Sequence, residues 1–84
     1  MMYVCDNQRH LICVPYSIDN LHIMADDLNI NRCWFRNKKP KGTALRKPHY
    51  DIPVKRMKEI QDKCVVVPYK TIMKIIKDSY ETTL

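Results

Sequence analysis

The first part of the chain alternates between strand-like and helix-like hydrophobic patterns. Met2–Cys5 and His10–Val14 are short apolar runs bounded by polar residues and a proline, which predicts two β-strands. Apolar residues then recur at the spacing of one helical face, at Ile18, Leu21, Ala25 and Leu28. A serine precedes this stripe as a typical N-cap, and Asn29 follows it as a residue suited to left-handed backbone. We therefore predict a helix over 18–28.

The second part of the chain predicts shorter elements. Residues 32–36 have an extended pattern, and a loop with several breakers runs from Asn37 to Pro48. Pro53 suits the first turn of a helix over 53–62, for which Asp51 or Ile52 would be the N-cap, and Asp51 fits the chemistry better. The valines at 65–67 form a continuously apolar run, which predicts an interior strand. A last helix is predicted over 70–79.

This order, β-β-α-β-α-β-α, predicts an α/β fold in which a short mixed sheet is packed by three helices. With 84 residues the chain is expected to be one domain with a small core.

Positive charge is concentrated in the middle of the chain. Ten of the 15 Lys and Arg residues lie from Arg32 to Lys58, where Asp51 is the only acid, although the net charge is only +6. A local excess of this kind suits a phosphate-bearing partner, and it also suits a solvated loop that keeps a small protein soluble.

The four cysteines form no Cys-x-x-Cys pair, and the first residues do not resemble a signal peptide. No apolar run approaches the roughly 20 residues that span a bilayer. We therefore expect reduced thiols and a cytoplasmic protein without a membrane segment.

Chemically active side chains cluster around the predicted start of the second helix. A helix N-terminus favours an anion, and an arginine there can hold a phosphate through two hydrogen bonds. Adjacent aromatics on a strand face opposite sides, so one is predicted to be in the core and the other, preferably Trp34, to be able to stack on a ring. The candidate ligand-binding residues are Arg9, Trp34, Phe35, His49, Tyr50, Asp51, Lys55 and Arg56.

Reactive alternatives involve the histidines. His10 and His49 could act as base and acid on a phosphodiester without a metal, because imidazole titrates near neutral pH. A zinc set of Cys5, His10, Cys13 and His49 matches no compact zinc spacing. Asp6 and Asp51 are too few carboxylates for a divalent-metal nuclease. We therefore expect no metal and no cofactor.

Several fragments occur in an order that resembles a known family. They are Tyr3-Val4-x-Asp6, His10-Leu11-Ile12, Leu21-His22-x-Met24-Ala25, Arg32-x-Trp34-Phe35, His49-Tyr50-Asp51-Ile52 and Lys55-Arg56. Together they resemble the bacterial and phage family called domain of unknown function 4031, over about residues 3–67, which leaves the last helix outside the match. The resemblance implies that these residues belong to one site and that the protein could be phage-encoded. It implies no particular activity.

Three functions follow from these patterns. The first is binding of a phosphorylated small molecule, such as a nucleotide or cyclic nucleotide, which in a phage setting could sequester a host immune signal in the host cytoplasm. The second is a metal-independent phosphodiesterase or nuclease that uses His10 and His49. The third is DNA or RNA binding through the basic loop from Asn37 to Pro48. The mixed groups around one helix start favour the first.

The last predicted helix carries a broad apolar stripe. Its members are Ile72, Met73, Ile75, Ile76 and Tyr80. In a domain with a small core, this face could pack on a second copy to form a homo-oligomer, or it could cover the sheet of its own chain.

Overall fold

The structure is a computed structural model that describes residues 1–37 and 47–81. One five-stranded sheet has the order β3-β4-β2-β1-β5. The strands are β1 (Met2–Cys5), β2 (His10–Val14), β3 (Phe35–Arg36), β4 (His49–Asp51) and β5 (Val65–Val66). β5 is parallel to β1, and the other neighbours are antiparallel. The predicted α/β fold with a mixed sheet is confirmed, and β1 and β2 have the predicted bounds.

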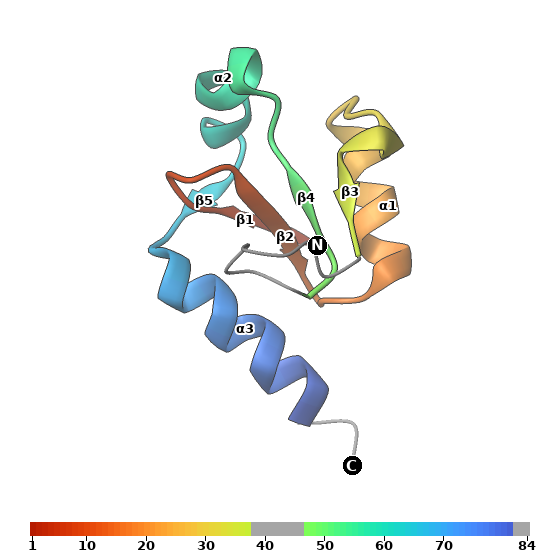
Figure 1. The fold of residues 1–84 in the computed structure, drawn as a ribbon, viewed down its shortest axis with the longest axis vertical. Coiled ribbons are helices and arrows are strands. Elements are labelled where there is room, and N and C mark those ends of the chain that lie inside the picture. Colours follow the sequence, from red (N-terminus) through yellow and green to blue (C-terminus); the bar gives the residue numbers. More distant parts are fainter. Residues whose placement is uncertain (38–46, 82–84) are drawn as a thin grey trace.

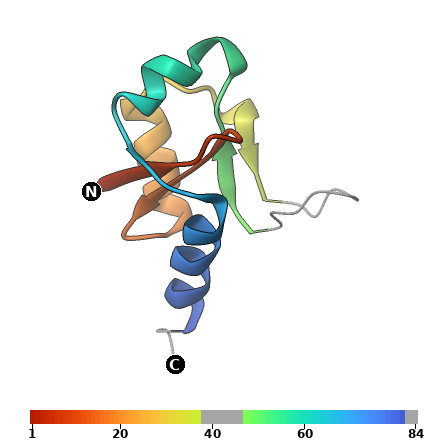
Figure 2. The same ribbon diagram turned by 90° about the vertical axis from the view of Figure 1, so that its left-hand side faces the viewer.

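Helices surround this sheet on three sides. They are α1 (Ile18–Asp27), the 3-10 turns η1 (Arg32–Trp34) and η2 (Val54–Arg56), α2 (Met57–Gln61) and α3 (Tyr69–Glu81). α2 and α3 lie at opposite ends of the molecule, with the sheet between them (Figure 1, Figure 2). Ser17 caps α1 by accepting the Asn20 N–H at 3.0 Å, and Asn29 has a φ of 55° just beyond its end. Both predicted caps of α1 are confirmed.

Strand alternation assigns the central side chains to two faces of the sheet. His10 is paired with Asp51, and Leu11 with Tyr50. His10, His49 and Asp51 therefore share one face, here called the polar face, whereas Leu11 and Tyr50 share the other, the apolar face. α1 covers the apolar face, where the Tyr50 hydroxyl lies 2.7 Å from Nδ1 of the α1 histidine.

The core is closed by aliphatic side chains from every layer. Its fully buried members include Leu11, Ile12, Leu21, Met24, Ile52, Ile60, Ile72 and Ile76. Burial of such residues contributes about 1.5–3 kcal/mol each, which is the main stabilisation available to so short a chain. The same packing fixes the sheet that carries the polar face.

The valine run is not an interior strand, so that prediction was wrong. β5 pairs only with β1 and forms an edge of the sheet. Val65 is 48% exposed and Val66 is 44% exposed. A continuously apolar run is typical of a central strand, but it does not specify whether another strand lies beyond it, because that partner would come from a distant segment.

Three other local predictions need correction. Asp51 lies in β4 and not at a helix N-cap, and the second helix is divided into η2 and the short α2. Neither η2 nor α2 has a side-chain cap. Residues 32–34 form η1 instead of extended chain, with Asn31 as its cap. Asp51 is held in β4 by its pairing with His10 of β2. η1 and η2 are instead closed by local hydrogen bonds, from Trp34 N–H to the Asn31 carbonyl and from Arg56 N–H to the Pro53 carbonyl.

The apolar stripe of α3 packs largely within its own chain. Ile72 and Ile76 are buried, whereas Met73 and Ile75 are half-buried. The side chain of Tyr80 lies outside the described part. Within one chain the helix packs on the sheet, and packing of this face on a second copy stays a prediction. Among the described residues, no helix is long and apolar enough to cross a membrane.

Candidate functional site

Two histidine–carboxylate pairs meet on the polar face of the sheet. The ring centroids of His10 and His49 are 5.3 Å apart, with the planes inclined at 64°. The ring of Tyr69, the first residue of α3, lies 5.1 Å from that of His10. The register of β2 with β4 and the arrival of α3 bring these rings together from three separate segments.

The first pair, Asp6 and His10, closes the turn between β1 and β2. Asp6 is 1% exposed. Its Oδ1 accepts the backbone N–H groups of Gln8 at 2.7 Å and His10 at 3.0 Å, and its Oδ2 lies 2.7 Å from His10 Nδ1. A carboxylate oxygen only accepts, so the proton of the His10 ring is held on Nδ1. The second ring nitrogen, Nε2, has no hydrogen-bond partner among the described residues.

The second pair, His49 and Asp51, has the opposite exposure. His49 is 5% exposed, and its Nδ1 donates to the Lys47 carbonyl at 2.7 Å. Its Nε2 faces Asp51 Oδ1 at 3.3 Å. Burial lowers the pKa of His49, although the Lys47 carbonyl and Asp51 act in the opposite direction. Burial therefore favours the uncharged ring, whose Nε2 faces the Asp51 carboxylate.

Two guanidinium groups lie over the indole ring of Trp34 at the edge of the sheet. The Cζ atom of Arg9 lies 5.6 Å from the ring centroid of Trp34, and that of Arg36 lies 5.9 Å from it. Arg36 also donates through Nε to Asp51 Oδ2 at 3.0 Å. Cation–π contacts and the ion pair hold both charges beside the histidine pairs.

Arg9 is held by an unusual backbone as well as by its side chain. Its φ is 92°, a region that a residue with a β-carbon seldom adopts. Its carbonyl accepts the Ile52 N–H at 2.8 Å, while its Nε donates to the Ile52 carbonyl at 2.7 Å. These bonds fix the guanidinium to the end of β4 and leave its terminal nitrogens without a partner among the described residues.

Two predicted ligand-binding residues lie on the opposite face. Tyr50 is fully buried, and Phe35 is half-buried with its ring centroid 5.3 Å from that of Tyr50. Both rings contact His22 of α1. Trp34 and Phe35 are both half-buried and packed against the core, so the assignment of one to the core and the other to stacking stays a prediction. The structure separates Phe35 and Tyr50 from the cluster on the polar face.

Lys55 and Arg56 also lie apart from the cluster. Arg56 donates to the carbonyls of Leu28 and Asn29, each at 2.7 Å, and pairs with Glu59. It therefore stabilises the end of α1, where carbonyls lack helical partners. Lys55 is exposed and has no contact with the cluster in the described part of the chain. The predicted convergence of His49, Lys55 and Arg56 on one pocket was wrong, because Arg56 of η2 is directed to the end of α1.

Three members of the site were not among the predicted ligand-binding residues. The sequence predicts Asp6 at most as a metal ligand, and it does not predict Arg36 or Tyr69 as site residues. The signal for Asp6 was its place in the fragment Tyr3-Val4-x-Asp6. Arg36 could be placed only once its pairing with His49 across β3 and β4 was known. Most of the basic loop from Asn37 to Pro48 lies outside the described residues.

The zinc set considered from the sequence is divided by the sheet. The register pairs Cys5 with Leu11 and gives Cys13 the same parity, so both thiols belong to the apolar face. His10 and His49 belong to the polar face. No group of three or more His, Cys, Asp or Glu residues within the described ranges could hold a metal ion.

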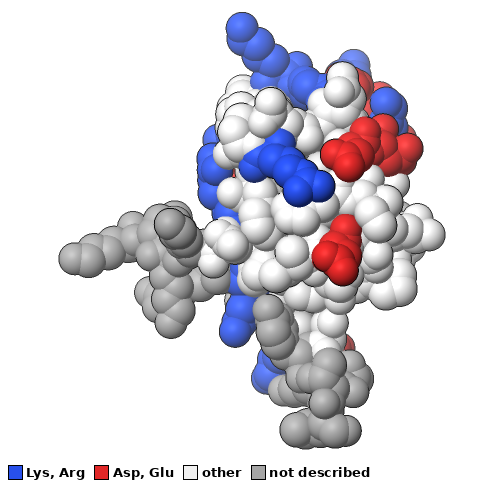
Figure 3. Space-filling model, turned by 90° about the vertical axis from the view of Figure 1, so that its right-hand side faces the viewer, with Lys and Arg blue, Asp and Glu red and all other residues white. Residues whose placement is uncertain are grey.

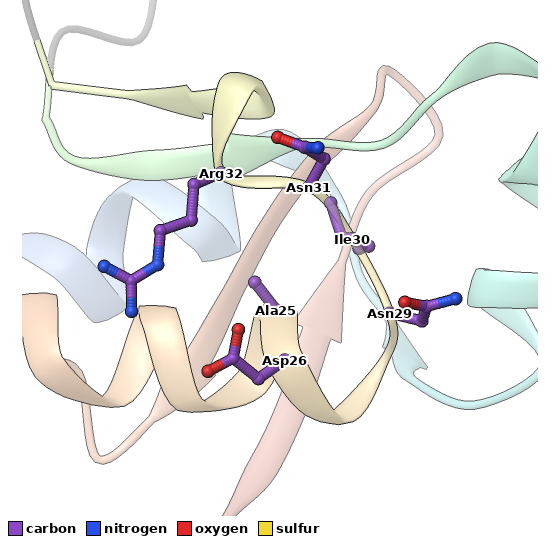
Figure 4. A pocket seen from close by; sticks show the side chains of 6 residues that line it. All are labelled: Ala25, Asp26, Asn29, Ile30, Asn31 and Arg32. Carbon is purple, nitrogen blue, oxygen red and sulfur yellow. The ribbon is translucent and has the colours of Figure 1, made fainter.

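A separate pocket of about 460 Å³ lies between the end of α1 and η1 (Figure 4). It is lined by Ala25, Asp26, Asn29, Ile30, Asn31 and Arg32. It contains none of the histidines. The face of the molecule that carries α1 shows acidic and basic side chains among broad uncharged areas (Figure 3).

No protein-family model matches the chain, and neither the curated proteins nor the solved structures contain a significant match. The resemblance to domain of unknown function 4031 therefore stays a prediction.

Proposed function

We propose that this protein binds a phosphorylated small molecule, such as a nucleotide, on the polar face beside Arg9, His10 and Arg36. The observation that carries the proposal is the placement of two guanidinium groups on one indole next to a partly exposed imidazole. Arginine matches phosphate geometry better than lysine does, because its planar group can donate two parallel hydrogen bonds.

Trp34 has a different role from the one that the sequence suggested. Its ring already contacts both guanidinium groups, so it serves as their platform and leaves less of its surface for a nucleobase. An arginine that is already held in place loses less conformational entropy when the ligand binds. The entropic cost of forming the complex is therefore smaller. The two arginines would therefore supply the affinity for phosphate, and Trp34 would position them.

Binding without chemical change would lower the free concentration of the ligand. If the protein is phage-encoded, as the family resemblance implies, this is how it would act against a nucleotide signal of its host. Nucleic-acid binding through the basic loop is a separate proposal, and it depends on residues outside those described.

The test is a binding measurement with a panel of nucleotides, using native mass spectrometry of the complex and calorimetry for affinity. Arg9→Ala and Arg36→Ala should each weaken binding by about 1.5–3 kcal/mol, the range for a charged hydrogen bond. Arg32→Ala is the matched control, because it removes the same charge from an exposed position in the pocket beside α1.

The proposal fails if Arg9→Ala and Arg36→Ala leave the affinity unchanged in folded protein. A folded Arg56→Ala variant that loses affinity, while Arg9→Ala does not, would place the ligand at the start of α2. Ligand that is recovered intact after denaturation shows binding alone.

A further inference from the structure

The geometry points to a reaction at this same site: we infer that His10, positioned by Asp6, is a general base. It would take the proton of a ribose 2′-hydroxyl as that oxygen attacks the neighbouring 3′-phosphodiester. The inference rests on the proposed binding of a phosphorylated ligand. It goes beyond that proposal by assigning a catalytic residue, a positioning residue and a substrate class. The substrate is a phosphodiester on the 3′-oxygen of a ribose that keeps its 2′-hydroxyl.

The hydrogen bonds of His10 suit the role of a general base. The buried Asp6 carboxylate accepts two backbone N–H groups from its own turn, so it cannot rotate away from the ring. Its Oδ2 also accepts a hydrogen bond from Nδ1–H of His10 at 2.7 Å, so the lone pair of the ring is on Nε2. The His10 side chain is 17% exposed, and no described residue forms a hydrogen bond with Nε2. A recurrent catalytic arrangement has a carboxylate bonded to one nitrogen of an imidazole while the other nitrogen acts as the base.

His49 is not the acid partner that the sequence suggested. Its Nδ1 is bonded to the Lys47 carbonyl, and its Nε2 faces Asp51, so both nitrogens are directed at groups of the protein. The ring is almost fully buried. A mechanism with two imidazoles on opposite sides of the substrate would require His49 to leave these contacts. One imidazole, His10, must therefore carry the proton in both directions.

A ribose phosphodiester suits a single base because its nucleophile is already attached. A neighbouring hydroxyl has a very high effective concentration, so positioning a second reactant is not needed. His10 Nε2 takes the proton of the 2′-hydroxyl as the 2′-oxygen bonds to phosphorus. The bond from phosphorus to the 5′-oxygen breaks, and that oxygen receives the proton from Nε2. The products are a 2′,3′-cyclic phosphate and a free 5′-hydroxyl.

The two arginines would stabilise the charge that develops on the phosphoryl oxygens. Arg9 has terminal nitrogens without a described partner, and it adjoins His10 in the chain. A phosphate held by its guanidinium would lie beside the base. The same contacts that favour binding would then favour the transition state.

The experiment uses the whole protein with adenylyl-(3′→5′)-adenosine as substrate and its 2′-deoxy form as the uncleavable control. Products are separated by liquid chromatography and identified by mass, and binding of the deoxy form is measured in parallel. We expect cyclic phosphate from the ribose form only. His10→Gln should lower the rate by about 10²–10⁴-fold, the usual contribution of a general base. His22→Gln, the matched control on the apolar face, should keep the rate.

Asp6→Asn tests the positioning role, provided that its circular dichroism matches that of the unchanged protein. We expect a lower kcat with little change in KM, and a ¹⁵N spectrum in which the His10 proton is no longer held on Nδ1. A second variant, Asp6→Glu, should restore part of the rate if the carboxylate itself matters. Equal rates in all three proteins would overturn the positioning role.

Each result separates the inference from the function on which it rests. Binding of the deoxy form without cleavage of the ribose form overturns the inference and leaves the proposed function standing. Failure of both binding and cleavage overturns both. Cleavage that survives His10→Gln in a folded protein overturns the assignment of His10 and points to a contaminating nuclease.

Discussion

The two histidine–carboxylate pairs have the same chemical groups in opposite arrangements. In the first pair the carboxylate of Asp6 is buried and the imidazole of His10 reaches the surface. In the second the imidazole of His49 is buried and the carboxylate of Asp51 is partly exposed, with Arg36 bonded to it. Identical residue types therefore present different atoms to a ligand.

The position of the proton on each imidazole decides what each pair can do chemically. A neutral His10 satisfies Asp6 and still offers a lone pair outward. A neutral His49 satisfies the Lys47 carbonyl and directs its lone pair at Asp51, an arrangement that one additional proton would complete. The first pair is thus suited to take a proton from a ligand, whereas the second is suited to hold its own strand and Arg36 in place.

The largest expected difference between the pairs is in stability. Asp6→Ala removes the buried acceptor of three part-buried N–H donors, which should cost about 3–5 kcal/mol. Asp51→Ala should cost only about 1 kcal/mol, because its ion pair with Arg36 is partly exposed. Urea unfolding followed by the fluorescence of Trp34 measures both. Equal losses would mean that the two carboxylates have the same role.

The second prediction concerns pH. The pKa of His49 is lowered in the folded chain from its ordinary value of 6.5, so between the two values the unfolded chain binds more protons. Stability should be fully present above about pH 6.5 and should be lost as the pH falls towards the folded pKa, by at most about 1.4 kcal/mol per pH unit.

His49→Gln is the control for this pH dependence, because glutamine keeps a donor for the Lys47 carbonyl but does not titrate. In that variant the slope between neutral pH and pH 5 should become smaller. If the slope is unchanged, another group is responsible and the buried imidazole is not the difference between the pairs.

The smallest expected effect comes from Arg36. Arg36→Ala removes a partly exposed ion pair, so stability at pH 8 should fall by about 0.5–1 kcal/mol. It also leaves the Asp51 carboxylate without its cation, which should raise the pKa of His49. An NMR titration of the His49 ring measures that shift, and Lys74→Ala on the exposed side of α3 is the control. A shift of equal size in both variants would show that only net charge matters.

Much of the fold could be predicted because its signals are local. β1 and β2 are bounded by turn residues and Pro15, and α1 has its stripe, its serine cap and Asn29 within one short segment. The edge position of β5 could not be predicted, because apolar residues in sequence do not reveal whether a neighbouring strand exists. Because β5 is an edge strand, Val65 and Val66 are exposed.

The site was predictable in its chemistry but not in its membership. The sequence alone determined that imidazoles, carboxylates, arginines and one indole occur in a basic chain that resembles domain of unknown function 4031. Only the tertiary structure decided which of them meet. Pairing of β2 with β4 sets His10 beside His49, and the same alternation turns Tyr50 into the core. Arg56 was directed to the end of α1 because carbonyls there lacked partners. Such choices depend on contacts between distant segments, which local patterns do not contain.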